Sequence, residues 1–337
     1  MSQKAIIEAL KNPEAYDEKV FYVKVLQTHI SYIFLTGHYA YKVKKPVNFG
    51  FLDFTTLEKR RFYCEEELRL NRRLCGDMYI DVLPITLSDG SVKINGSGKI
   101  VEYAVKMKEL PQEALMSELL KKGRVDMNVM DEIAKILSDF HKKAETNREI
   151  ESYGSIDTVR FNWDENFDQT KEFIGRTIKR QDYSFIHRAV QEFLKNRKDL
   201  FRLRQRKGRI KECHGDLHSG NIFIADRIYI YDAIEFNERF RCCDVASDIA
   251  FLLMDLEFLN KSDLSNRFLI KYLEYSGEEE DFLEVLPFYK CYRAYVRGKV
   301  TSFKLNDPNI TEEEKERSKE IARKYFQMSR QYAEEIF

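Results

Sequence analysis

The sequence reads Cys213-His214-Gly215-Asp216-Leu217-His218-Ser219-Gly220-Asn221 at the point that most restricts its fold. Two short apolar segments follow, 222–224 and 228–231, and the turn formers Ala225-Asp226-Arg227 between them predict a hairpin. Asp232 comes directly after it. We expect the hairpin to bring Asn221 and Asp232 side by side at one end, with Asp216 five positions before Asn221.

Asp216, Asn221 and Asp232 match the needs of phosphoryl transfer. That reaction asks a protein to orient a hydroxyl group, hold a metal ion and neutralise phosphate charge. An Asp, an Asn five positions later and a second Asp after a hairpin are typical of kinase catalytic loops. We interpret Asp216 as the catalytic residue, and Asn221 and Asp232 as ligands of Mg²⁺, which prefers hard oxygen atoms. The alternative is a polar loop in which these residues only form turns.

His214 and His218 lie within the same loop. Neither has a Cys or a second His at the spacing of a zinc site, so we expect both to hold the structure rather than to bind metal.

The run from Cys213 to Asp248 resembles the aminoglycoside phosphotransferase-like kinases, within the wider protein-kinase-like fold. Further motifs are similar to the kinase half of the bifunctional aminoglycoside phosphotransferase/ATP-binding protein family: Thr28-His29-Ile30-Ser31, Tyr41-Lys42-Val43-Lys44-Lys45-Pro46, Phe49-Gly50-Phe51-Leu52-Asp53-Phe54 and Leu70-Asn71-Arg72-Arg73-Leu74. The resemblance implies a bilobal α+β fold, in which a small antiparallel β lobe carries one long helix and the large lobe is mainly helical. It also implies ATP as phosphate donor and Asp248 as a brace beneath the catalytic loop.

Proteins of that bifunctional family often continue into a P-loop domain. No Gly-x-x-x-x-Gly-Lys-Ser/Thr occurs in this sequence. We therefore expect a second nucleotide site to be absent or to be supplied by a separate P-loop ATP-binding protein.

The chain is long enough for two lobes of ordinary size. We predict a small nucleotide-binding lobe over residues 1–107, a hinge over 108–111, and a large lobe over 112–337 that holds the catalytic loop and the acceptor site. Periodicity and turn signals predict strands at Val20–Val25, Tyr32–Leu35, Tyr39–Lys45, Tyr79–Leu87 and Lys99–Met107, a long helix from a Thr55/Glu58 capping box to Gly76, and final helices at Glu280–Leu305 and Thr311–Phe337.

Lys42 and Lys44 lie two positions apart on one strand, so both side chains point to the same face. We predict that Lys42 binds the α- and β-phosphates, with Lys44 as the alternative and an ordinary solvated basic strand as the remaining interpretation. Glu67 shares a helix face with Leu70 and Leu74, and is predicted to tether the lysine. Its neighbours in sequence, Glu65 and Glu66, are expected in solvent.

Ser31 stands in the turn that covers the phosphates in kinase-like small lobes, and this turn contains no glycine. Hydroxyl groups and backbone amides are therefore expected to hold the phosphates. The backbone of the hinge, at Lys108 and Leu110, is expected to bind the adenine edge.

Arg293 and Arg297 follow Tyr289 at i, i+4 and i+8 on the penultimate helix, and so line one face. Two guanidinium groups there could clamp a carboxylate or a phosphate, which predicts an anionic acceptor. The alternative is that they pair with acidic residues of neighbouring helices.

Composition restricts the class of protein further. The 56 basic and 56 acidic residues give no net charge, so no global field favours nucleic acid or an anionic membrane. No signal peptide or membrane-spanning segment is evident, and the 6 cysteines show no Cys-x-x-Cys pairing. We expect a cytoplasmic protein with reduced, buried thiols. The basic run Arg202–Arg209 lacks aromatic residues and is expected to be a solvated helix end.

These features predict a kinase that transfers the γ-phosphate of ATP, with Mg²⁺, to a hydroxyl group of a small molecule. A protein Ser/Thr kinase is the second interpretation. Only eleven residues separate Asp232 from Asp244, too few for a peptide-docking segment, and Gly215 replaces the arginine of His-Arg-Asp kinases. A nucleotide-binding regulator without transfer activity is the third interpretation.

Overall fold

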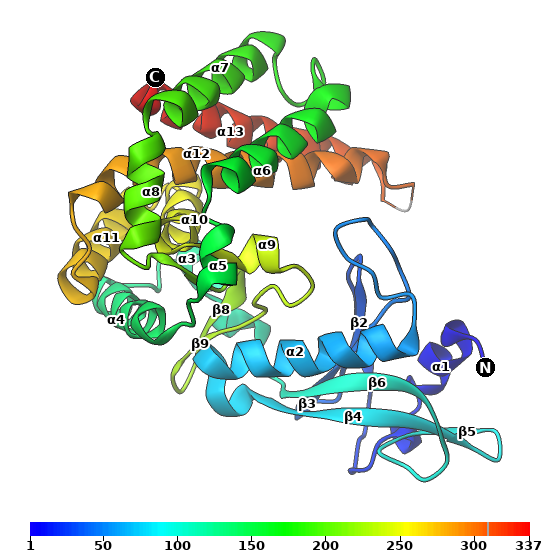
Figure 1. Cartoon of the computed structure of the whole chain (residues 1–337). Helices are drawn as coiled ribbons and strands as arrows, with labels where there is room; N and C mark the ends of the chain where they lie inside the picture. The colour runs from blue at the N-terminus through cyan, green and yellow to red at the C-terminus, as the bar shows by residue number, and fades with distance from the viewer. Residues whose placement is uncertain (309) are drawn as a thin grey trace. The chain divides into compact units, whose positions relative to one another are not determined.

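The computed structural model describes residues 1–308 and 310–337, which form two compact units (Figure 1). Unit 1 comprises Met1–Lys122 and Gly220–Glu238, and unit 2 comprises Gly123–Ser219 and Arg239–Phe337. The predicted hinge at 108–111 lies inside unit 1, and the catalytic hairpin, predicted within the large lobe, belongs to unit 1 as well. The functional assignment of the two lobes stays a prediction.

Unit 1 is built on a six-stranded antiparallel sheet in the order β1-β2-β3-β6-β4-β5. Its strands are β1 (Lys24–Gln27), β2 (Ser31–Leu35), β3 (Tyr39–Lys44), β4 (Tyr79–Ser88), β5 (Ser91–Ile94) and β6 (Lys99–Lys108). The first strand begins at Lys24, not at Val20, because Lys24 pairs with Leu35, the last residue of β2. Residues before Lys24 have no β2 partner to pair with.

Helix α2 (Leu57–Cys75) lies across β6 and β4 (Figure 1). Thr56 caps its N-terminus by accepting the backbone N–H of Lys59, so the predicted Thr55/Glu58 capping box is wrong by one residue. The helix ends at Gly76, as predicted, where φ is +53°.

The hairpin of β8 (Ile222–Ile224) and β9 (Ile228–Ile230) is confirmed, with its turn at 225–227. Phe223 and Tyr229 pack in one apolar cluster with α2 and the sheet, which includes Cys64, Tyr79 and Val105. This burial explains why the hairpin belongs to unit 1. Two short helices, α1 (Gln3–Ala9) and α3 (Met116–Lys121), complete the unit.

Unit 2 is mainly helical. Its helices are α4 (Met127–Lys143), α5 (Arg148–Ser152), α6 (Ile156–Thr170), α7 (Arg180–Asn196), α8 (Lys198–Arg206), α9 (Glu238–Arg241, starting at the last residue of unit 1), α10 (Val245–Phe258), α11 (Ser262–Ser276), α12 (Glu280–Phe303) and α13 (Glu312–Ile336). Strand β7 (Ile210–Glu212) pairs with β10 (Cys242–Asp244). Helix α10 is buried on nearly all sides, and α12 packs against it and against α13. The predicted capping box of Thr311 and Glu314 is confirmed.

The basic run at the end of α8 differs from the prediction of a solvated helix end. Arg202 is exposed, but Arg204 is fully buried. Its guanidinium group donates two hydrogen bonds to Asp244, of 2.9 and 2.6 Å. The remaining Nη1 donates to Glu278 and Asp281, so the charge is matched inside the protein.

In the part of the chain that the structure describes, no helix is both long and apolar enough to cross a bilayer. Five of the six cysteines are buried, which agrees with the prediction of mostly buried thiols.

Candidate functional site

Side chains of alternating charge form a continuous series of ion pairs in the interior of unit 1. The ammonium group of Lys42 lies 2.8 Å from Glu67 and 2.7 Å from Asp232. The ammonium group of Lys44 lies 2.7 Å from the other oxygen of Glu67 and also pairs with Glu235. Strand β3, helix α2 and the segment after β9 each contribute members, so the ion pairs join three elements that are distant in sequence.

Burial and neighbouring charges shift the pKa values of these ion-paired residues in opposite directions. Burial alone would lower the pKa of Lys42, but Asp232 and Glu67 raise it well above its usual value. Burial would raise the pKa of Glu67, but Lys42 and Lys44 lower it to about 2. Glu235 behaves differently, because burial and the nearby Glu67 carboxylate raise its pKa in spite of Lys44. Both lysines and Glu67 are therefore charged at neutral pH.

The predicted inward position of Glu67 is confirmed, since its side chain is fully buried while Glu65 and Glu66 pair with arginines at the surface of α2. Lys44 is fully buried between two carboxylates, whereas Lys42 reaches the partly exposed Asp232. Glu235 was assigned no role from the sequence. The signal that could have identified Glu235 is its position as the one acidic residue among the apolar Ala233, Ile234 and Phe236.

The backbone around Asp232 is held in an unusual conformation. Asp232 has φ +63°, in the left-handed region that non-glycine residues seldom adopt. The Asn71 amide of α2 donates to the Glu67 carbonyl (2.8 Å) and accepts the N–H of Ala233 (2.9 Å). The N–H of Tyr231 donates to the carbonyl of Asn221 at 3.0 Å, which brings the two predicted metal ligands to the same end of the hairpin.

The predicted metal ligands fit Mg²⁺ by their chemistry. Asn221 offers an amide oxygen and Asp232 a carboxylate whose side chain is 43% exposed. Mg²⁺ requires hard oxygen donors and retains some water ligands. Asp232 is open to water, whereas Asn221 is buried. Their role in metal binding stays a prediction.

The other predicted nucleotide contacts lie around the sheet. Ser31 is fully buried beside Lys44 in the β2–β3 ladder, and its hydroxyl group has no hydrogen-bond partner within the described residues. The side chain of Lys108 pairs with Asp77. Leu110 packs against the apolar cluster of Phe223 and Tyr229, and the structure shows no hydrogen bond from its amide to any described residue.

The first prediction concerns the Lys44–Glu235 pair. Lys44→Met leaves a buried carboxylate unmatched, and should lower the free energy of unfolding by about 3–5 kcal/mol. The double variant Lys44→Met/Glu235→Gln should recover most of the loss. Chemical denaturation of the four proteins of this cycle measures both effects. The control is Lys59→Met, which breaks the exposed pair with Asp53 and should change stability little. A double variant as unstable as Lys44→Met would contradict the matched-charge interpretation.

In unit 2 the predicted catalytic residue Asp216 lies beside two histidines. His218 Nε2 is 3.4 Å from a carboxylate oxygen of Asp216, and the backbone N–H of Asp216 donates to His214 Nδ1 at 3.3 Å. Burial would raise the pKa of Asp216, but His218, followed by Arg297 and His214, holds it well below its usual value. Asp216 is therefore ionised at neutral pH, as its predicted role requires.

Asp248 braces the loop from α10, as the resemblance implied. One of its oxygens accepts the N–H of Gly215 (2.9 Å), and the other accepts the N–H of His214 (3.1 Å) and lies 3.2 Å from His141 Nε2. The second nitrogen of His141 lies 2.9 Å from the hydroxyl group of Tyr272. The buried Asp248 thus ties two helices to the loop.

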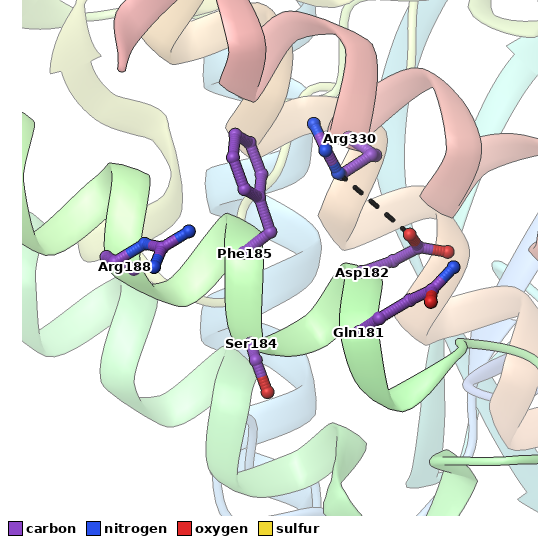
Figure 2. A pocket seen from close by; sticks show the side chains of 6 residues that line it. All are labelled: Gln181, Asp182, Ser184, Phe185, Arg188 and Arg330. Atoms are coloured by element: carbon purple, nitrogen blue, oxygen red, sulfur yellow. Dashed lines mark ion pairs between the residues drawn. The ribbon is translucent and has the colours of Figure 1, made fainter.

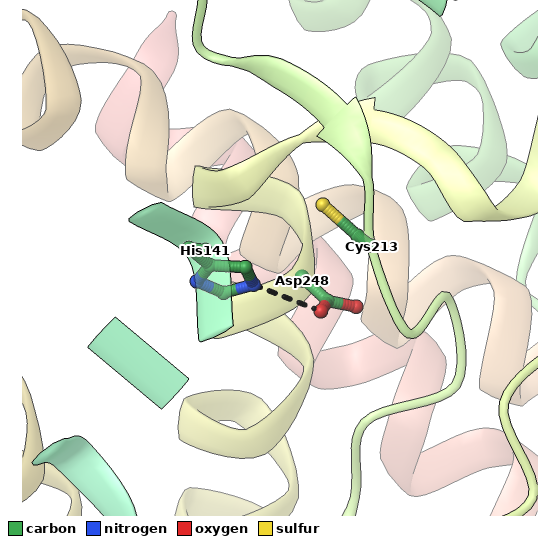
Figure 3. A group of neighbouring side chains, drawn as sticks. All are labelled: His141, Cys213 and Asp248. Atoms are coloured by element: carbon green, nitrogen blue, oxygen red, sulfur yellow. Dashed lines mark hydrogen bonds and ion pairs between the residues drawn. The ribbon is translucent and has the colours of Figure 1, made fainter. Parts of the chain in front are cut away.

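His141, Cys213 and Asp248 form the group drawn in Figure 3, with one potential ligand atom from each within 4.8 Å of the others. Hydrogen bonds already engage both nitrogens of His141 and both oxygens of Asp248. Burial raises the pKa of the Cys213 thiol, which disfavours the thiolate that metals bind. We interpret the group as a hydrogen-bonded brace.

Gly215 has a structural reason to lack a side chain. Its φ is +85°, and a Cβ there would meet the carbonyl oxygen of Phe240 at 3.0 Å and the Cα of Arg241 at 3.1 Å. The close approach of α9 leaves no room for the arginine of His-Arg-Asp kinases.

The two predicted acceptor-binding arginines have different surroundings. Arg293 is buried, and its guanidinium group donates to the carbonyls of Ser247 (3.1 Å) and Gly215 (2.9 Å). Neither the predicted clamp nor the alternative of acidic partners describes these contacts, because both acceptors are backbone groups. The Nε of Arg297 is buried without a hydrogen-bond partner among the described residues.

A separate pocket lies on α7 and α13 (Figure 2) and is lined by Gln181, Asp182, Ser184, Phe185, Arg188 and Arg330. Arg330 lies 3.9 Å from Asp182 and 2.6 Å from Glu334, and it stacks over the Phe185 ring. Since protein groups already engage Arg330, we assign no ligand to this pocket.

The second prediction concerns Asp248. Its carboxyl pKa is lowered to about 2, because His141 and the neighbouring positive charges outweigh burial. A lowered pKa gives stability that is present above the ordinary pKa of 3.8 and is lost as pH falls toward 2. Asp248→Asn should therefore cost on the order of 2 kcal/mol at pH 7. Denaturation from pH 7 to pH 2 should show the difference from wild type shrinking below about pH 4. A difference independent of pH would contradict this account.

No family model matches the chain. Uncharacterized proteins of Mycobacterium tuberculosis and Mycobacterium bovis are 33% identical to it over 280 residues, covering 83% of this chain and 54% of each relative. The chain thus spans about half the length of the curated relatives that it matches.

Solved structures are similar over nearly the whole chain. A microcompartment-associated aminopropanol kinase has a TM-score of 0.55 at 14% identity, covering 99% of this chain and 98% of that one. A choline/ethanolamine kinase family protein of Mesorhizobium loti has a TM-score of 0.52 at 12% identity, covering 98% and 99%. An amicoumacin kinase in complex with AMP-PNP and Ca²⁺ has a TM-score of 0.51 at 12% identity, covering 97% and 93%.

These similarities confirm the predicted fold class. The chain has the bilobal α+β fold of kinases, with an antiparallel sheet and one long helix in the smaller unit. The finer resemblance to the bifunctional family stays a prediction.

Proposed function

We propose that the protein is a kinase that transfers the γ-phosphate of ATP to a hydroxyl group of a small molecule, with Mg²⁺ as cofactor. The observation that carries the proposal is the position of the Lys42 ammonium group, 2.8 Å from Glu67 and 2.7 Å from Asp232. These contacts join the residue types that kinase sites use to bind phosphates, to fix the lysine and to hold the metal. Three proteins of similar fold are kinases named for aminopropanol, for choline or ethanolamine and for amicoumacin, which supports a small acceptor.

The nucleotide is assigned to unit 1. Lys42 would contact the α- and β-phosphates while Glu67 fixes its position, and the Ser31 turn would cover them. The backbone of Lys108 and Leu110 would bind the adenine edge. Lys44 is less suited to the phosphates, because it is fully buried and paired with two carboxylates.

Asn221 and Asp232 would hold Mg²⁺, which when bound neutralises charge on the phosphates. Asp216 would accept or orient the proton of the acceptor hydroxyl group, and its lowered pKa keeps its carboxylate ionised at neutral pH. Their spacing in the sequence is that of kinase catalytic loops.

A protein kinase is a weaker candidate. Most of the short segment between Asp232 and Asp244 is taken up by α9 and β10, and β10 pairs with β7. Gly215 has no space for a side chain that could bind a phosphorylated loop. A cytoplasmic location and a separate P-loop partner stay predictions of the sequence.

The third prediction tests the chemical step. Asp216→Asn should keep Mg·ATP binding and lower turnover by at least ~10²-fold, because it removes the group that accepts the proton. Asp232→Ala should also lose metal-dependent nucleotide binding. Calorimetry with Mg·ATP and a turnover assay separate the two effects. Unchanged turnover in Asp216→Asn would contradict the assignment.

The acceptor class is tested with ATP labelled on its γ-phosphate, incubated with the protein alone, with a protein extract and with a metabolite extract. The proposal predicts label in small molecules only, and loss of that label with Asp216→Asn. Label in other proteins would favour the protein kinase, and Mg²⁺-dependent binding without transfer would favour the regulator.

A further inference from the structure

Buried N–H donors without acceptors gather on α6 and α12 of unit 2. Among the described residues, six buried side-chain nitrogen or oxygen atoms lack a hydrogen-bond partner, and three of them are donors on these two helices: Trp163 Nε1, Asn166 Nδ2 and Arg297 Nε. Proteins rarely leave such donors unpaired unless a water molecule, an ion or a ligand completes them. The two helices contact each other within unit 2.

Lys299 adds a buried cation to the same region. It is only 9% exposed, and its ammonium group donates to the neutral side chain of Gln169 on α6, at 2.7 Å. Within the described residues, no carboxylate lies within 4.0 Å of that ammonium group, and burial lowers its pKa to about 8. Removing a cation from water without an anionic partner is costly, and an anion bound beside it would offset the cost.

Helical periodicity relates Arg297 to Lys299 on α12. At 3.6 residues per turn, Arg297 and Lys299 lie on either side of a stripe formed by Val296 and Val300. Val300 is 48% exposed and Val296 is partly exposed, so the stripe is open to solvent in unit 2. The positive charge of Arg297 also helps to lower the pKa of Asp216. An anion held by Arg297 would therefore lie near the predicted catalytic residue.

We propose that Arg297 and Lys299 bind the anionic group of the acceptor, a carboxylate or a phosphate, with its carbon skeleton along Val296 and Val300. This inference rests on the proposed kinase function, and it names the acceptor as an anionic hydroxy compound. Arg293 is not a member of the site, because backbone carbonyls already engage its guanidinium group. Glu165 offsets only part of the effect of burial on Lys299, since it also pairs with Arg239 at 2.9 Å, and the pKa of Lys299 stays lowered.

The fourth prediction uses inorganic phosphate as the probe, with the nucleotide site filled by Mg²⁺ and a non-hydrolysable ATP analogue. Wild type should bind phosphate, and Arg297→Met and Lys299→Met should each weaken binding about tenfold or more, or about 1.4 kcal/mol. The control is Lys290→Met, which removes the same charge from α12 where Glu257 already pairs with it at 2.7 Å. Calorimetry measures binding, and thermal unfolding shows that each variant is folded.

Phosphate binding that is absent in wild type, or equal in wild type and both variants, would overturn the anion site. Lys299→Gln and Arg297→Lys replace any methionine variant that does not fold, and Arg297→Lys should retain part of the binding. The labelled-ATP assay separates the two proposals. Absence of transfer in wild type would overturn the kinase function and the acceptor role with it. Intact transfer with unchanged phosphate binding in the variants would overturn the anion site alone.

Discussion

The fully buried carboxylate of Glu67 is the constraint on which unit 1 depends. A buried carboxylate is tolerated only when cations and hydrogen-bond donors surround it. Lys42 and Lys44 meet this need from one face of β3, and each lysine is in turn matched by an acidic residue of the segment after β9. Strand, helix and hairpin are thus joined by these ion pairs. The same contacts fix the position of Asp232, whose backbone is strained.

In unit 2, the loop from His214 to Asp216 is likewise held by charged side chains from other parts of the sequence. Asp248 accepts two backbone N–H groups of this loop, while Arg293 donates to one of its carbonyls. The loop is therefore held by neighbouring helices and not by a phosphorylated segment. This agrees with the absence of space at Gly215 for a side chain.

The features that the sequence predicted correctly depend on local patterns. The hairpin follows from two apolar segments around a turn, the burial of Glu67 from its helix face, and the Thr311 cap from the spacing of two residues. The missed features depend on partners distant in the chain. Lys44 meets Glu235 across 191 positions, and Arg204 is buried because Asp244, Glu278 and Asp281 surround it. A single sequence shows the charge of such a residue but not its partner.

The protein's own charges fix α2 and the segment around Asp232. Amide hydrogen exchange over residues 60–75 and 230–236, measured with and without Mg·ATP, tests this most directly. Because Lys44, Glu67 and Glu235 are matched within the protein, we predict strong protection without nucleotide and a change of less than about threefold when it binds. Rapid exchange without nucleotide, followed by protection of both segments on binding Mg·ATP, would contradict the account.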